Sequence, residues 1–131
     1  MPLLVLNSNT TLTPSQKNEL ATRLADITES VLRKRRQVIV VRFDGGDPGD
    51  RWYSDGVIDP ATVTIFELSI LITTGTNTEQ EKADWIAQAW SVVTGVLGAC
   101  THANYISVRE IDGTDWGYNG LTQDQRKAQA I

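Results

Sequence analysis

The chain opens with MPLLVL (residues 1–6), a proline followed at once by a continuous apolar run. Such a run is typical of a strand that is buried on both faces of a sheet. Proline is tolerated at the first residue of a strand because it has no N–H to contribute to the ladder. If the initiator methionine is removed, however, Pro2 becomes the N-terminus and its ring nitrogen becomes a free secondary amine. Pro2 is therefore either a strand starter or a base at the edge of a sheet.

Two helices are predicted from paired start signals and apolar stripes. The segment TPSQ (13–16) combines a capping threonine, a proline at the first helical position and a capping-box glutamine. It begins a helix expected over 14–33, closed by the basic cluster RKRR (33–36) where cations favour the negative end of the helix dipole. The segment TEQE (78–81) repeats the capping box before a helix expected over 79–97. The stripe predicted for this second helix comprises Ile86, Ala89, Trp90, Val93, Val96 and Leu97, while Trp85 and Trp90 are expected in core or subunit packing.

Further strands are predicted at 38–43, 63–72 and 105–109, and an aromatic loop is predicted over 113–120. Thr122 can cap a short C-terminal helix. The chain thus forms a single domain (1–131) of two strand–helix–strand pseudo-repeats, at about 2–43 and 63–110. Two such units predict an α+β fold, a four-stranded sheet with both helices on one face. The other face would be bare although its strands are apolar, which predicts burial against another subunit.

Composition narrows the class of protein. The chain has 131 residues and a net charge of −4, so a general nucleic-acid-binding surface is disfavoured. No apolar stretch approaches the roughly 20 residues needed to span a bilayer, and a signal-peptide pattern is missing. The single cysteine, Cys100, excludes an internal disulfide framework and is typical of a reducing compartment. We therefore expect a cytoplasmic domain without nucleic-acid or membrane partners.

The opening strand and the basic cluster are predicted to lie together. Parallel strands joined by a right-handed crossover begin at the same edge of a sheet, so Lys34, Arg35 and Arg36 should lie close to Pro2. An α-amine has an ordinary pKa of about 8, and nearby cations lower that pKa. The same cations attract an anionic substrate. Such an amine is a usable base near neutral pH. The alternative is that the cluster is simply a solvated helix end.

The other polar clusters do not predict a catalytic or metal-binding site. The turn-rich segment DGGDPGD (44–50) has neither a P-loop lysine nor EF-hand spacing, so nucleotide and calcium sites are not predicted. Trp52 and Tyr53 follow it and are expected in a short edge strand that lines a pocket or an interface. Cys100 and His102 stand close together without further ligands, so neither a metal site nor a thiol–imidazole pair is predicted there.

The Met1-Pro2 start, the tandem βαβ pattern and the tail WGYNG (116–120) together resemble the tautomerase superfamily. The segments NSN (7–9) and GYN (117–119) are similar to the macrophage migration inhibitory factor branch. The pair Asp115-Trp116, followed by a glycine-aromatic segment, is more similar to the malonate semialdehyde decarboxylase branch. The resemblance implies a cofactor-independent homotrimer, with an N-terminal proline in a pocket at each subunit boundary.

The resemblance also implies roles for particular residues. Pro2 matches the catalytic proline, and Lys34 matches a lysine that contacts the carboxylate of a small keto or enol acid, with Arg36 as a nearby cation. Tyr105 matches an active-site tyrosine, and Ser107 stands where that branch has an asparagine. Trp116 and Tyr118 fall where the superfamily brings aromatic residues to the pocket. The implied reaction is keto–enol tautomerisation of a 2-oxo acid.

Departures from the superfamily weaken the other reactions. Decarboxylase and dehalogenase branches carry arginines just after the third strand, where this chain reads LITTGT (71–76). The acid that activates water in those branches has no clear match in this chain, and Asp55 and Asp115 are candidates for it. A decarboxylase or hydratase therefore stays the alternative enzyme. Two further alternatives are a non-catalytic binding protein that uses the 44–62 loop, and a ferredoxin-like domain in which proline only starts a strand.

Overall fold

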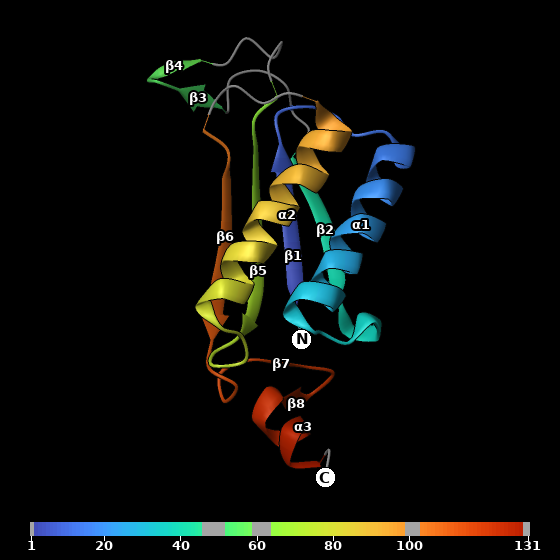
Figure 1. The fold of residues 1–131 in the computed structure, drawn as a ribbon, viewed down its shortest axis with the longest axis vertical. Coiled ribbons are helices and arrows are strands. Elements are labelled where there is room, and N and C mark those ends of the chain that lie inside the picture. Colours follow the sequence, from blue (N-terminus) through green and yellow to red (C-terminus); the bar gives the residue numbers. More distant parts are fainter. Residues whose placement is uncertain (1, 46–51, 59–63, 99–102, 130–131) are drawn as a thin grey trace.

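The computed structural model describes residues 2–45, 52–58, 64–98 and 103–129. In Figure 1 two long helices lie side by side across one face of a sheet, and a small unit formed by the last residues lies beyond its lower end. The main elements are β1 (Leu3–Ser8), α1 (Pro14–Leu32), β2 (Val40–Gly45), β5 (Phe66–Thr73), α2 (Glu79–Leu97) and β6 (Tyr105–Ile111). The shorter elements are the 3₁₀ turn η1 (Arg36–Val38), β3 (Tyr53–Ser54), β4 (Val57–Ile58), β7 (Gly117–Tyr118), β8 (Leu121–Thr122) and α3 (Gln123–Gln129).

The four long strands form one mixed sheet in the order β2-β1-β5-β6. Strand β1 is parallel to β2 and antiparallel to β5, and β5 is parallel to β6. Each parallel pair is joined through a helix, and both helices cover the same face (Figure 1). The predicted α+β architecture of two βαβ units is confirmed. Among the described residues, no helix is long and apolar enough to cross a membrane.

Two strand predictions need correction. Strand β2 begins at Val40 rather than at residue 38, because Arg36–Val38 form a 3₁₀ turn in which Val38 N–H donates to the carbonyl of Arg35. The short strand expected at Trp52-Tyr53 is Tyr53–Ser54, and it pairs with β4 in a separate two-stranded ribbon instead of edging the main sheet. The ribbon closes because the turn residues Asp55 and Gly56 both have positive φ, as a two-residue hairpin turn requires.

The helix starts follow the predicted capping chemistry. Thr13 Oγ1 accepts from the Gln16 N–H at 3.1 Å, and Gln16 Oε1 accepts from the Thr13 N–H at 2.9 Å. Thr78 and Glu81 form the same reciprocal pair at the start of α2. The end of α1 differs from the prediction, because the helix stops at Leu32 and Arg33 takes a left-handed conformation with φ of 58°. The basic cluster therefore follows the helix and leaves it at an angle, instead of occupying its last turn.

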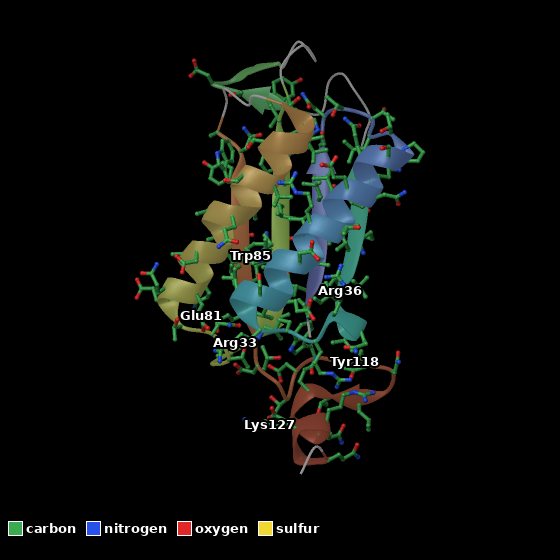
Figure 2. All side chains as sticks on the ribbon, turned by 45° about the vertical axis from the view of Figure 1, so that its right-hand side comes forward. Arg33, Arg36, Glu81, Trp85, Tyr118 and Lys127 are labelled. Carbon is green, nitrogen blue, oxygen red and sulfur yellow. The ribbon has the colours of Figure 1, made fainter. Side chains whose placement is uncertain are left out.

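The core lies between the sheet and the two helices, and Trp85 stands at its centre (Figure 2). The stripe predicted for α2 is confirmed at Ala89 and Val93, which are buried, and at Val96 and Leu97, which pack against the core. It is wrong at Ile86 and Trp90, which are 36% and 38% exposed, whereas Trp85 is fully buried. The α2 residues that are buried are Trp85, Ala89, Val92 and Val93. Contact with α1 turns the helix this way, since the Trp85 indole N–H donates to Thr28 Oγ1 at 3.1 Å on the facing helix.

The sheet face opposite the helices is only partly apolar. Strand β5 buries every second residue against the helices, as a one-sided strand does. On the opposite face, Arg42 pairs with Asp44, and Tyr105 is 73% exposed. The expectation of strands that are apolar on both faces is therefore met in part, and the open face mixes apolar and charged side chains.

The predicted aromatic loop over 113–120 contains a β-hairpin followed by a helix. Asn119 and Gly120 both have positive φ, which makes a two-residue hairpin turn between β7 and β8. A side chain at Gly117 would collide with the carbonyl of Leu121, so the two strands approach this closely only with glycine there. The predicted Thr122 cap forms as a capping box with Gln125, at 3.0 and 2.9 Å, and begins α3.

Candidate active site

Pro2 is buried and lines a cavity of about 220 Å³ at the end of the sheet where β1 begins. The carbonyl of Pro2 accepts a hydrogen bond from the Val40 N–H at 3.2 Å, which ties this end of β1 to β2. The cavity is mostly apolar, and its other lining residues are Leu3, Val38, Val40, Trp116, Gly117, Tyr118 and Gln123. The structure thus brings Pro2, Trp116 and Tyr118 into one cavity, three residues that the sequence singled out.

The aromatic wall of this cavity is anchored to the sheet. The Trp116 indole N–H donates to Thr73 Oγ1 at 3.1 Å, at the last residue of β5. The neighbouring Tyr118 lies under the Arg126 guanidinium, which stacks 3.8 Å from the ring centroid and donates to the Tyr118 carbonyl at 2.8 Å. The wall is therefore held at two points, by the end of β5 and by α3. Sequence reasoning missed Arg126, although the Thr122 cap places it on the helix that follows the hairpin.

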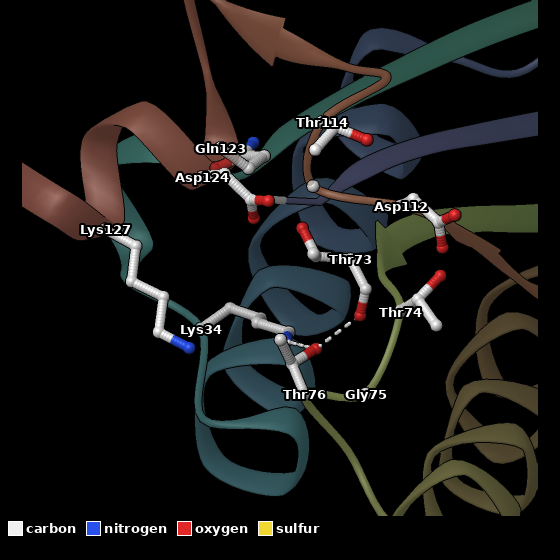
Figure 3. A pocket seen from close by; sticks show the side chains of 11 residues that line it. Lys34, Thr73, Thr74, Gly75, Thr76, Asp112, Thr114, Gln123, Asp124 and Lys127 are labelled. Atoms are coloured by element: carbon white, nitrogen blue, oxygen red, sulfur yellow. Dashed lines mark hydrogen bonds between the residues drawn. The ribbon is translucent and has the colours of Figure 1, made fainter.

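A second, larger cavity of about 530 Å³ contains Lys34 (Figure 3). Lys34 Nζ donates to Thr76 Oγ1 at 2.9 Å, and that hydroxyl donates to the Thr73 carbonyl at 2.7 Å. Burial, and secondly the charge of Arg33, lower the pKa of Lys34 from its ordinary value. The cavity also takes residues from α3 and from the loop after β6: Asp112, Gly113, Thr114, Gln123, Asp124 and Lys127.

The basic cluster is not gathered around Pro2 as the sequence suggested. Lys34 opens into the larger cavity, which shares the wall residue Gln123 with the Pro2 cavity. Arg36 instead turns to α1, where it pairs with Asp26 at 2.6 Å and with Glu29 at 3.5 Å. Those carboxylates raise the pKa of the guanidinium and hold it away from both cavities. Arg35 is exposed and lines neither cavity.

Tyr105 and Ser107 lie far from Pro2 within one protomer. The strand register aligns Leu3 with Leu71 and Arg109, whereas Tyr105 pairs with Glu67 at the other end of the sheet. Tyr105 lies four residues along β6 from Arg109, which is about 13 Å in the strand direction, and β6 lies two strands from β1, which is about 10 Å across the sheet. Tyr105 is therefore separated from the Pro2 end of β1 in both directions. Ser107 accepts a hydrogen bond from Arg109 Nε at 3.4 Å. No side chain spans that distance, so neither residue completes this cavity from within its own chain.

The remaining candidates lie elsewhere. Asp55 occupies the turn of the β3–β4 ribbon, at the end of the molecule away from Pro2 (Figure 1). Asp115 lies in the turn before β7, where its side chain accepts from Thr114 Oγ1 at 3.0 Å and its N–H donates to the Asp112 carbonyl. Cys100 and His102 lie outside the described residues.

The turn that borders the Lys34 cavity is held by Glu110. Its carboxylate accepts from Lys82 Nζ at 2.5 Å and from the Gly75 N–H at 3.1 Å. These bonds lower the pKa of Glu110 from its ordinary value. Because the pKa of Glu110 is lower in the folded state, its ionised carboxylate stabilises the protein at pH values above the unfolded-state pKa of about 4.3. This contribution is lost as the pH falls through the folded-state pKa.

We expect Glu110→Gln to lower the free energy of unfolding at pH 7 by about 0.5–1 kcal/mol, the range for a partly exposed ion pair. The difference from the wild type should shrink as the pH falls below the unfolded-state value and through the lowered folded-state value, because the wild-type carboxylate then becomes protonated too. Urea unfolding at several pH values measures it. Glu19→Gln, which breaks an exposed pair with Arg23, is the matched control and should cost less. An equal loss at pH 3 and pH 7 would contradict this account.

Comparison with known proteins finds solved structures with the same fold, but it finds no matching sequence family. No protein-family profile matches the chain, and no curated protein matches it significantly. The solved structure of Pt0534, inactivated by 2-oxo-3-pentynoate, is similar with a TM-score of 0.83 at 14% identity, covering 95% of this chain and 98% of that one. Fused 4-OT, solved as an asymmetric trimer, is similar with a TM-score of 0.80 at 18% identity, with the same two coverages.

Macrophage migration inhibitory factor of Toxoplasma gondii is similar with a TM-score of 0.71 at 14% identity, covering 92% of this chain and 98% of that one. These likenesses run along nearly the whole of each chain, so they concern the complete arrangement of sheet and helices. At such identities they establish the fold rather than an activity. The chain therefore has the fold of Pt0534, fused 4-OT and macrophage migration inhibitory factor, as its resemblance to the tautomerase superfamily led us to expect.

Proposed function

We propose that this chain is a cofactor-independent keto–enol tautomerase acting on a small 2-oxo acid, with Pro2 as its general base after removal of Met1. The observation that carries the proposal is the burial of Pro2 in an apolar, aromatic-walled cavity at the end of the sheet. An apolar lining disfavours the protonated form of an amine, so it favours the form that can accept a proton. The fold supports the proposal, since fused 4-OT and Pt0534 share it.

The proposed reaction moves one proton and needs no oxidant. The neutral Pro2 nitrogen takes a proton from the carbon beside the substrate carbonyl. The electrons of that C–H bond form the carbon–carbon double bond, and the carbonyl π electrons move onto oxygen. The oxygen then takes the proton back from Pro2, which gives the enol and restores the neutral amine. Lys34 is the proposed anchor for the substrate carboxylate, which would replace its present partner, Thr76. Trp116 and Tyr118 would hold the apolar part of the substrate.

We further propose that the active unit is a homotrimer, since fused 4-OT, which has the same fold, is a trimer. A trimer would cover the open face of the sheet, where Val40 is 56% and Tyr105 is 73% exposed. Tyr105 and Ser107 would then reach the Pro2 cavity of a neighbouring subunit. They lie too far from the Pro2 of their own chain to act there. Arg36 would contribute only after release from Asp26 and Glu29.

Labelling with 2-oxo-3-pentynoate, the reagent that inactivates Pt0534, tests whether Pro2 is a free and reactive amine. The secondary amine would add across the activated alkyne, so the adduct mass equals that of the protein plus one reagent molecule. We expect one adduct per chain, located on the N-terminal peptide by mass spectrometry. Protein with an uncleaved N-terminal extension, whose Pro2 nitrogen is an amide, should stay unmodified. Equal labelling of both forms would refute the assignment of Pro2.

A further inference from the structure

Gln123 is the one described residue that lines both the Pro2 cavity and the Lys34 cavity. In Figure 3 its side chain lies close to Asp124 and across the Lys34 cavity from Thr73. The amide nitrogen, Nε2, is buried and has no hydrogen-bond partner among the described residues. Buried donors without a partner are uncommon in folded proteins, so this one requires a physical reason.

The backbone around Gln123 is firmly held. Its N–H donates to the Trp116 carbonyl at 3.0 Å, and Trp116 is itself bonded to Thr73. The following residue, Asp124, donates its N–H to the carbonyl of Gly113 at 3.0 Å, where a side chain in place of glycine would collide with the Asp124 carboxylate. These backbone hydrogen bonds hold Gln123 in place, so the position from which its side-chain amide extends is fixed.

A ligand that spans the two cavities would supply the missing acceptor. Its reacting carbon would lie in the apolar cavity at Pro2, and its anionic end would lie toward Lys34, so its oxygen atoms would pass Gln123. A carboxylate or enolate oxygen accepts two or more hydrogen bonds and forms charge-assisted ones. The lining has two lysines, Lys34 and Lys127, and two carboxylates, Asp112 and Asp124, so its charges balance and a directed donor is what selects an oxygen.

Building on the proposed tautomerase function, we propose that Gln123 is a specificity-determining residue whose amide nitrogen donates to an oxygen of the bound 2-oxo acid between Pro2 and Lys34. The group is kept unpaired in the free protein, and the substrate pairs it. Two consequences of opposite sign follow. Removing the donor weakens binding of the acid, and it removes a buried unpaired group from the free protein.

Binding of benzoylformate separates this proposal from the catalytic one, because this 2-oxo acid has no proton to lose beside its carbonyl and cannot enolise. We expect calorimetry to show at least about tenfold weaker binding to Gln123→Met than to wild type, since a hydrogen bond to a charged group is lost. The preference for benzoylformate over its methyl ester should shrink by a similar factor. Gln129→Met, an exposed glutamine on the same helix, is the matched control and should bind as wild type does.

The stability of the free protein provides the second readout. Gln123→Met should unfold at the same temperature as wild type or higher, and it should still be labelled at Pro2 by 2-oxo-3-pentynoate. Should this variant fail to fold, Gln123→Glu provides the same test, because a carboxylate at that place repels the acid. Equal binding by wild type and both variants, or no binding of benzoylformate by wild type, would overturn the role of Gln123. Neither result would affect the labelling of Pro2, so the two proposals fail separately.

Discussion

Replacing Pro2 with alanine is expected to lower kcat/KM for the enolisation of phenylpyruvate by on the order of 10²-fold, the lower range for loss of a general base. The alanine variant still begins with a free amine, but this primary backbone amine lacks the ring that lines the cavity and so loses the position that the ring holds. Continuous measurement of the enol absorbance, with 2-hydroxymuconate as a second substrate, gives the rates. Because the neutral amine is the active form, the wild-type rate should rise with pH and then level off.

Two comparisons make the Pro2 result specific. Pro14→Ala removes the other described proline of the first βαβ unit, at the start of α1, and should leave the rate unchanged. Protein that retains Met1 or a longer extension should be as inactive as the alanine variant, because an amide nitrogen is not basic. Unchanged turnover by Pro2→Ala would end the catalytic proposal and favour a binding protein with this fold.

Replacing Trp85 with alanine is expected to lower the free energy of unfolding by about 3–5 kcal/mol, the range for deleting a buried aromatic side chain. Trp85 is fully buried between the helices and the sheet, and its indole N–H donates to Thr28 Oγ1, whose own proton goes to the Leu24 carbonyl at 2.7 Å. The loss should lower the melting temperature by more than about 10 °C. Chemical unfolding at one fixed protein concentration measures it without interference from subunit association.

The hydrogen bond and the packing of Trp85 can be separated. Thr28→Val keeps the shape of that side chain but leaves the indole N–H buried without a partner, at a cost of about 1–3 kcal/mol. Trp90→Ala is the matched control on the same helix, and it should cost about 1 kcal/mol because that ring is 38% exposed. A loss at Trp90 equal to the loss at Trp85 would show that the assigned core is wrong.

Local signals predicted the helices closely. The helix expected over 14–33 is Pro14–Leu32, and the one expected over 79–97 has those bounds. Capping boxes act over three residues, so they can be found in the sequence without knowledge of the fold. The hairpin turn at Asn119-Gly120 carries an equally local signal, and the aromatic loop prediction did not use it.

Side-chain directions could not be predicted in the same way. The predicted stripe of α2 included Ile86 and omitted Trp85, because the partner that orients Trp85 is Thr28, 57 residues earlier in the chain. Lys34, Arg35 and Arg36 were expected close to Pro2, but the chain turns at the left-handed Arg33, and Arg36 pairs with Asp26. Nothing in the sequence marks Gln123 as a site residue. Its unpaired amide nitrogen and its place in the lining of both cavities are visible only in the folded chain.

The sequence by itself determined the two βαβ units, the helix starts and a proline at the head of a strand, because each depends on residues within one turn or one strand. Only the tertiary structure decided that Lys34 bonds to Thr76, that Trp116 is anchored to Thr73 and that Arg36 is held by α1. Those contacts join segments from different elements, so they form only when the sheet and helices have packed. The candidate active site belongs to this second group, with Pro2 as its one member that the first stretch of sequence already indicated.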